Sequence, residues 1–166
     1  MRIEIGPMVR ADARGVGELH HQSWVDTYAG ALPADYWDTW TVQRSVTRWR
    51  RILADPTPRR VVRLVAKEGR RVVGFCVRGP ARGKPEIAPA RAAELWAVYV
   101  ETRLYGSGLG QGLVDRCLGP GEPAEVWVWS GNARAVAFYR RNGFEPDGAT
   151  FVDERHPQLD EIRLVR

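Results

Sequence analysis

Three glycines occur at alternate positions near the middle of the chain. They lie in Tyr105-Gly-Ser-Gly-Leu-Gly110, after the apolar run Leu95 to Val100 and before residues 109–117, whose apolar members have helical spacing. A strand that ends in a glycine-rich turn and leads into a helix gathers unpaired backbone N–H groups at the positive end of the helix dipole. This arrangement predicts a binding site for a phosphate or another anion.

The spacing of these glycines does not fit two common nucleotide-binding motifs. A P-loop needs Lys and Ser or Thr after its glycines, whereas this chain has Gly110-Gln111-Gly112. A dinucleotide fingerprint needs glycine at position 111 or 113, where the chain has Gln111 and Leu113. The remaining pattern, x-G-x-G-x-G after a strand of the form E-L-x-A-V-Y-V, resembles the acetyl-CoA loop of the GNAT superfamily of N-acetyltransferases.

A second motif supports this resemblance. Residues 125–129 (EVWVW) are typical of a strand, and Asn132 then opens ARAVAFYRRNGF. Asn132 suits a helix N-cap, and Gly143 suits the left-handed residue that follows a helix. The order is similar to the next strand and helix of the family, in which F-Y-x-x-x-G-F ends the helix. The two motifs together cover the C-terminal half of the chain.

The composition is that of a globular protein with an excess of basic residues. The chain has 166 residues, of which 44% are hydrophobic and 27% charged, and its formal net charge is +5. We expect one domain, residues 1–166, in the cytoplasm, because no apolar run approaches a membrane span and no signal segment opens the chain. Arginine carries most of the positive charge, which could attract the phosphates of coenzyme A or, as the less favoured interpretation, tRNA.

The order of the expected elements favours an α/β (α+β) fold with a mixed, mostly antiparallel sheet. The strands 95–100 and 125–129 are joined by a helix, so they should be parallel. The resemblance implies the GNAT fold, with six to seven strands, about four flanking helices and this central pair splayed apart. Residues 79–91, rich in Gly, Pro and Ala, are expected to form an exposed loop.

The resemblance implies that acetyl-CoA binds in the gap between the splayed strands. The pantetheine arm would pair with the backbone of the first strand, and the loop amides would bind the pyrophosphate. Tyr105 and Ser107 depart from the Gln/Arg and basic residues usual in the family, but backbone amides bind whatever the side chain. The residues implied in binding are Val98, Tyr99, Val100, Tyr105, Gly106, Ser107, Gly108, Leu109, Gly110, Gln111 and Asn132.

The resemblance also implies roles for four further residues. Tyr139 matches a tyrosine whose hydroxyl lies near the coenzyme A sulfur, where a phenol can donate a proton to the departing thiolate; core packing is the alternative. Glu94 matches a glutamate that acts as a base through a water, or else it is a solvated residue at a strand end. Trp24 and Tyr28 lie in a segment similar to H-x-x-S-W-x-x-T-Y, and they either line the acceptor pocket or pack in the core.

We therefore predict an acetyl-CoA-dependent N-acetyltransferase that acts on the primary amine of a small molecule by direct attack in a ternary complex. Two alternatives stay open: the acceptor is a protein N-terminus or an aminoacyl-tRNA, or the chain is a non-catalytic acyl-CoA-binding module. The histidines and cysteines lack metal-ligand spacing, so no metal is predicted. The sequence leaves open the acceptor amine, the length of the acyl group, and whether the protein is a monomer or a homodimer.

Overall fold

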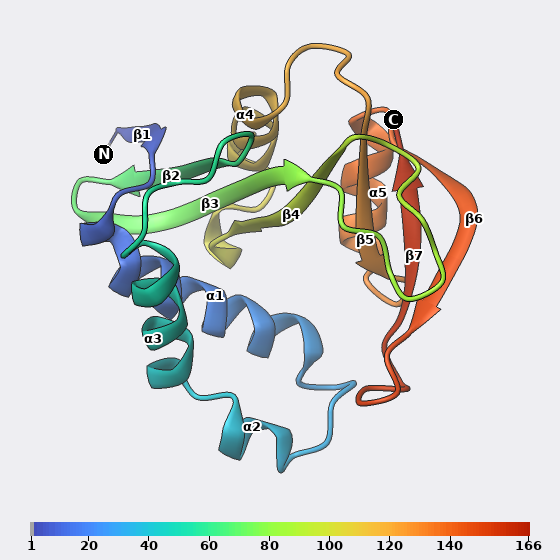
Figure 1. Ribbon diagram of the computed structural model, residues 1–166. Helices are drawn as coiled ribbons and strands as arrows, with labels where there is room; N and C mark the ends of the chain where they lie inside the picture. Colours follow the sequence, from blue (N-terminus) through green and yellow to red (C-terminus); the bar gives the residue numbers. More distant parts are fainter. Residues whose placement is uncertain (1) are drawn as a thin grey trace.

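The computed structural model describes residues 2–166, and a seven-stranded sheet forms its centre (Figure 1). The strand order is β1-β2-β3-β4-β5-β7-β6. Only β4 and β5 pair in parallel within these residues, which confirms the predicted mixed sheet with one central parallel pair. The strands are β1 (Ile3–Pro7), β2 (Val62–Glu68), β3 (Arg71–Pro80), β4 (Ala93–Val100), β5 (Ala124–Trp129), β6 (Glu145–Val152) and β7 (Asp160–Val165).

Residues 2–166 contain five α-helices, four of which pack on the two faces of the sheet (Figure 1). Helices α1 and α3 pack on one face, and α4 and α5 pack on the other. None of the helices in this part of the chain has the length and apolar character needed to cross a membrane. Their bounds are α1 (Ala13–Tyr28), α2 (Tyr36–Thr39), α3 (Val42–Ile52), α4 (Leu109–Cys117) and α5 (Ala133–Arg141).

The helical segment between Tyr36 and Ile52 is divided into α2 and α3. Trp40 leaves the helical conformation, with φ −89° and ψ 70°. Thr41 then caps α3, because its hydroxyl accepts a hydrogen bond from the backbone N–H of Arg44 at 3.2 Å. Val46 of α3 is buried against Gly17 of α1, and Trp49 is buried against Phe75 of the sheet, so the arginines at the other positions of the helix face outward.

Strands β4 and β5 pair only at one end. Ala93 lies opposite Ala124 and Glu94 opposite Glu125, and the pairing then stops. The other edge of β4 stays paired with β3 as far as Val100. The rest of β4 therefore leaves its β5-facing edge without a strand partner among the described residues, and the predicted splay is present.

A histidine lies within a cluster of aromatic rings between α1 and the sheet. The His20 ring is 5.0 Å from Tyr99 and 5.8 Å from Phe75, measured between ring centroids. Its Nδ1 accepts a hydrogen bond from Nε1 of Trp49 at 3.0 Å. Burial, helped by the positive charge of Arg48, lowers the pKa of His20 to about 4, so His20 is neutral at pH 7.

His20 should make folding stability depend on pH. Because its pKa in the folded protein lies below the ordinary value near 6.5, the unfolded chain takes up a proton first as the pH falls. We expect stability to fall by about 3 kcal/mol between pH 6.5 and pH 4 from this group. Urea unfolding of wild type and of His20→Gln across this pH range measures the loss of stability. Glutamine is chosen because its amide oxygen can still accept the hydrogen bond from Trp49. Equal losses in both proteins would contradict the assignment.

Candidate functional site

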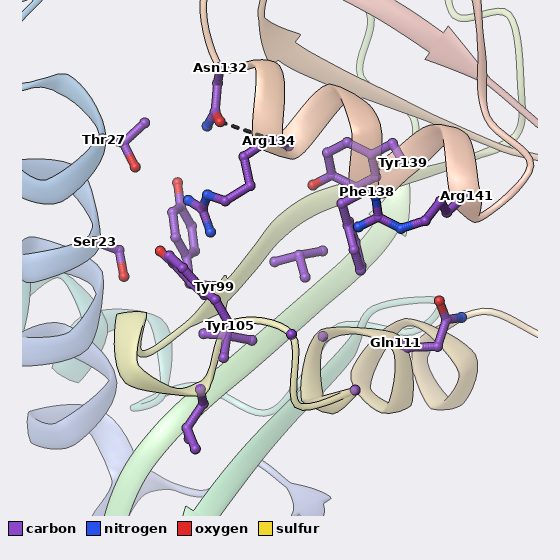
Figure 2. Close-up of a pocket in the computed structure, with 17 residues that line it drawn as sticks. Ser23, Thr27, Tyr99, Tyr105, Gln111, Asn132, Arg134, Phe138, Tyr139 and Arg141 are labelled. Carbon is purple, nitrogen blue, oxygen red and sulfur yellow. Dashed lines mark hydrogen bonds between the residues drawn. The ribbon is translucent and has the colours of Figure 1, made fainter.

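A cavity of about 380 Å³ lies beside the part of β4 that is no longer paired with β5 (Figure 2). Its walls come from the end of β4, the loop that follows it, the first turn of α4, one side of α5 and one side of α1. The residues singled out in the sequence that line this cavity are Val98, Tyr99, Val100, Tyr105, Gly106, Gly108, Gly110, Gln111, Asn132 and Tyr139. Segments far apart in the chain therefore meet at one site.

The loop between β4 and α4 presents free backbone N–H groups. Gly106 and Gly108 have φ of 79° and 85°, in the left-handed region that favours glycine. The first N–H of α4 that donates to a backbone oxygen is that of Gly112, which bonds to the Gly108 oxygen at 2.9 Å. The N–H groups of Gly106, Gly108, Gly110 and Gln111 have no hydrogen-bond partner within residues 2–166. This cluster of donors at a helix N-terminus suits an anion.

Two residues expected to bind the cofactor hold this loop in shape. The Ser107 hydroxyl donates to the Leu104 backbone oxygen at 2.7 Å and accepts from the Leu109 N–H at 3.3 Å. Neither Ser107 nor Leu109 lines the cavity. Their hydrogen bonds fix the turn, so the neighbouring amides are free to face the cavity.

Two arginines of α5 line the cavity and were not singled out in the sequence. Arg134 lies with its guanidinium carbon 3.6 Å from the centre of the Tyr105 ring, and Arg141 lies near the other end of α5 (Figure 2). Neither forms an ion pair with a residue in the described part of the chain. With Phe138 they stand at positions i, i+4 and i+7, so helical spacing was the signal that could have found them.

Asn132 caps α5, as its sequence context predicted. Its Oδ1 accepts a hydrogen bond from the Ala135 N–H at 3.1 Å. The same residue lines the cavity, so the N-termini of α4 and α5 both border it. A Cβ added at Gly110 would lie 3.3 Å from the Phe138 ring, so α4 and α5 approach closely there.

Tyr139 is buried in the core and reaches the cavity at the same time. Its ring packs against Phe138 and Phe144 at centroid distances of 5.3 and 5.9 Å. Burial raises the pKa of its hydroxyl above the ordinary value, so the hydroxyl is protonated at neutral pH. Figure 2 shows it on the side of α5 that faces the cavity. The two interpretations of this residue, packing and function, are therefore compatible.

The structure does not bring Trp24 or Tyr28 into the cavity. Ser23 and Thr27, one position earlier in each case, line it from α1. Trp24 packs behind them, where its Nε1 donates to the Tyr99 hydroxyl at 3.1 Å, and burial raises the pKa of Tyr99 to about 12. The i, i+4 spacing of Ser23 and Thr27 was the available signal.

Tyr28 connects α1 to β5 through an aromatic contact. Its ring lies 5.5 Å from Trp129 of β5 and 4.8 Å from Trp24. Burial raises the pKa of the Tyr28 hydroxyl above its ordinary value. The aromatic contact spans the space between α1 and β5 on the side of the splay opposite α5.

Glu94 lies at the closed end of the splay and not in the cavity. Its exposed fraction is 4%, so the expectation of a solvated residue at a strand end is wrong. Its Oε2 accepts from the Arg82 N–H at 2.9 Å and its Oε1 from the Arg82 guanidinium at 2.8 Å. A catalytic role for Glu94 stays a prediction, and both of its oxygens are occupied by Arg82.

A second buried carboxylate, which was not singled out in the sequence, lies beside Glu94. Glu125 is completely buried, and its Oε2 accepts from the N–H groups of Ala90 and Arg91 at 2.6 and 2.9 Å. Residues 81–92 are thus held against the sheet by Glu94 and Glu125, and the Lys84–Glu161 ion pair adds a third attachment. Several side chains of this loop are exposed, as expected, and its backbone is anchored by the two glutamates.

Comparison with known proteins agrees with this geometry. A family model described as the acetyltransferase (GNAT) family matches residues 21–144. A protein of Mycobacterium tuberculosis described as a probable N-acetyltransferase is 29% identical over 90 residues, which are 53% of this chain and 49% of that protein. The chain thus spans about half the length of the curated relative that it matches.

Three solved structures share the fold over nearly their whole length. The PaiA N-acetyltransferase from Thermoplasma acidophilum, in complex with coenzyme A, has a TM-score of 0.66 at 21% identity, covering 99% of this chain and 98% of that one. The protein yncA from Salmonella typhimurium, solved with acetyl-CoA, has a TM-score of 0.67 at 20% identity, covering 100% of this chain and 94% of that one. A ribosomal-protein-alanine N-acetyltransferase from Brucella melitensis has a TM-score of 0.67 at 22% identity, covering 98% of each chain. Since the family model also matches well over half of its residues, this chain belongs to the GNAT family of acetyltransferases.

Proposed function

We propose that this chain transfers an acetyl group from acetyl-CoA to the primary amine of a small molecule, by direct attack in a ternary complex. One observation carries the proposal: β4 and β5 separate after Glu94 and Glu125, and the cavity at the separation joins free loop amides to Tyr139. The donor is supported by proteins of the same fold that were solved with coenzyme A and with acetyl-CoA.

The residues of the cavity fit the donor in charge and in hydrogen bonding. The free amides of Gly106, Gly108, Gly110 and Gln111, together with the dipole of α4, would hold the pyrophosphate. Arg134 and Arg141 offer guanidinium groups to the phosphates. The unpaired edge of β4 offers N–H and C=O groups at Val98 to Val100 to the amide-bearing pantetheine arm. Bound there, acetyl-CoA supplies an activated acetyl thioester.

Tyr139 would stabilise the leaving group. In the transfer, the amine nitrogen bonds to the acetyl carbon, the carbon–sulfur bond breaks, and the extra proton of the amine passes to solvent or to a base. Burial raises the pKa of Tyr139 well above the ordinary thiol value of about 8.5. The hydroxyl therefore keeps its proton and donates a hydrogen bond to the sulfur as negative charge develops there.

The acceptor amine must lose a proton before it attacks. A lysine-like amine with a pKa of about 10.4 is neutral about once in 2,500 molecules at pH 7, which adds about 4.6 kcal/mol to the barrier. An amine with a pKa near 8 adds only about 1.4 kcal/mol. Because Arg82 holds both oxygens of Glu94, an acceptor of low pKa fits this site better than one that needs a strong base.

The walls beside the cavity favour a small acceptor. The Tyr28–Trp129 contact spans the space between α1 and β5, and Ser23 and Thr27 line the cavity from α1. Release of the thiol from acetyl-CoA across a panel of small primary amines tests the proposal. Release only with peptides or aminoacyl-tRNA would favour the alternative acceptors, and coenzyme A binding without any release would indicate a non-catalytic module.

Replacing Tyr139 by phenylalanine should separate catalysis from binding. Tyr139→Phe removes only the hydroxyl, so we expect kcat to fall about 100-fold, because one donor to the developing charge is lost. The Kd of coenzyme A should change less than threefold, about 0.6 kcal/mol. Steady-state kinetics and calorimetry measure the two quantities. An unchanged kcat would show that the hydroxyl has only a packing role.

Replacing Arg134 should weaken donor binding. Arg134→Gln removes one charge-assisted contact, so the Kd of coenzyme A should rise about tenfold. Arg140→Gln is the matched control, since Arg140 lies on the same helix, pairs with Glu145 at 3.6 Å and does not line the cavity. Calorimetry with both variants measures the Kd of coenzyme A. An equal rise in Kd in the two variants would show that Arg134 acts only through general surface charge.

A further inference from the structure

A second hollow, of about 650 Å³, lies on the outer side of α3. It is lined by Trp40 and Thr41, which precede the helix, and by one face of α3. Arg44, Arg48 and Arg51 stand on this face at positions i, i+4 and i+7, opposite the buried Val46 and Trp49. Three cationic side chains therefore converge on one concave surface.

The three arginines have no counter-charge. None of them forms an ion pair within residues 2–166, whereas Arg71, Arg78, Arg82, Arg103, Arg155 and Arg163 do. Among the described residues, their side chains make one hydrogen bond, from the Arg44 guanidinium to the Thr39 backbone oxygen at 3.3 Å. Like charges held together without a counter-ion repel one another, and a bound anion would remove that repulsion.

The start of α3 adds donors to the same hollow. Thr41 and Gln43 line it, and the first turn of α3 contains no acidic residue, so the positive end of the helix dipole is not neutralised. The Trp40 side chain also lines the hollow, and its indole N–H is buried and has no hydrogen-bond partner in the described part of the chain. The arginine charges and the helix dipole both favour an anionic ligand.

The hollow is separate from the cavity between β4 and α5. The Trp40 ring packs against Trp24 at 5.3 Å, and Trp24 donates to the hydroxyl of Tyr99, which lines that cavity. An aromatic layer therefore stands between the two. The two lining sets have no residue in common.

We propose that this hollow is an oxyanion site that takes the phosphate or carboxylate group of a small metabolite. Guanidinium groups bind both kinds of oxyanion through paired N–H donors, and the three arginines are free to do so. The site is independent of acetyl transfer, so its failure would leave the proposed function untouched.

The Trp40 indole N–H is a local reporter for the site. Its ¹⁵N–¹H signal, identified by its loss in Trp40→Phe, is followed while inorganic phosphate, and separately acetate, is added at constant ionic strength made up with chloride. This signal separates the hollow from the loop amides at Gly106 to Gln111, which also suit phosphate. The test variants are Arg48→Gln and Arg51→Gln. Arg50→Gln is the matched control, because Arg50 is exposed on the same helix and does not line the hollow.

We expect a saturable shift of the Trp40 signal in wild type and Arg50→Gln, and at least tenfold weaker binding in Arg48→Gln and Arg51→Gln. Saturation by phosphate alone would identify a phosphate group, and saturation by acetate alone a carboxylate. No shift with either anion, or an equal loss in Arg50→Gln, would overturn the proposal. Binding of single-stranded RNA with no response to phosphate would also overturn it.

Discussion

The separation of β4 from β5 is the constraint on which the rest of the structure depends. Two parallel pairs, Ala93 with Ala124 and Glu94 with Glu125, hold the strands together before they diverge. Unpaired backbone N–H and C=O groups are costly when they are buried, so a sheet interrupted at its centre needs either solvent or a ligand at that edge. The cavity at the end of β4 meets this need by leaving the edge open to an extended ligand that can pair with it.

Two buried carboxylates mark the closed end of the splay. Arg82 binds both oxygens of Glu94, and the N–H groups of Ala90 and Arg91 bind Oε2 of Glu125, whose Oε1 has no hydrogen-bond partner among the described residues. Burying a carboxylate is costly unless it accepts hydrogen bonds, so these contacts from the loop stabilise the paired end of the strands. No such carboxylate contacts are found at the open end among the described residues, so the backbone N–H groups of β4 there remain available for a ligand.

Positive charge is distributed over two places that do not overlap. Arg134 and Arg141 add formal charge to the dipole and free amides of the loop, which suits a donor with several phosphates. Arg44, Arg48 and Arg51 form the other group across an aromatic layer that includes Trp24 and Trp40. Part of the positive charge behind the net +5 is therefore concentrated at these two places.

The sequence by itself determined the features that depend on local backbone chemistry. Alternating glycines between a strand and a helix indicated the anion loop, and Asn132 marked the start of α5, because positive φ and helix capping are properties of a few neighbouring residues. Only the tertiary structure decided the rest of the site. It placed Ser23 and Thr27 in the cavity in place of Trp24 and Tyr28, and it set Glu94 against Arg82. These outcomes depend on helix rotation and on a loop that crosses the sheet, and such long-range packing leaves no local signal in the chain.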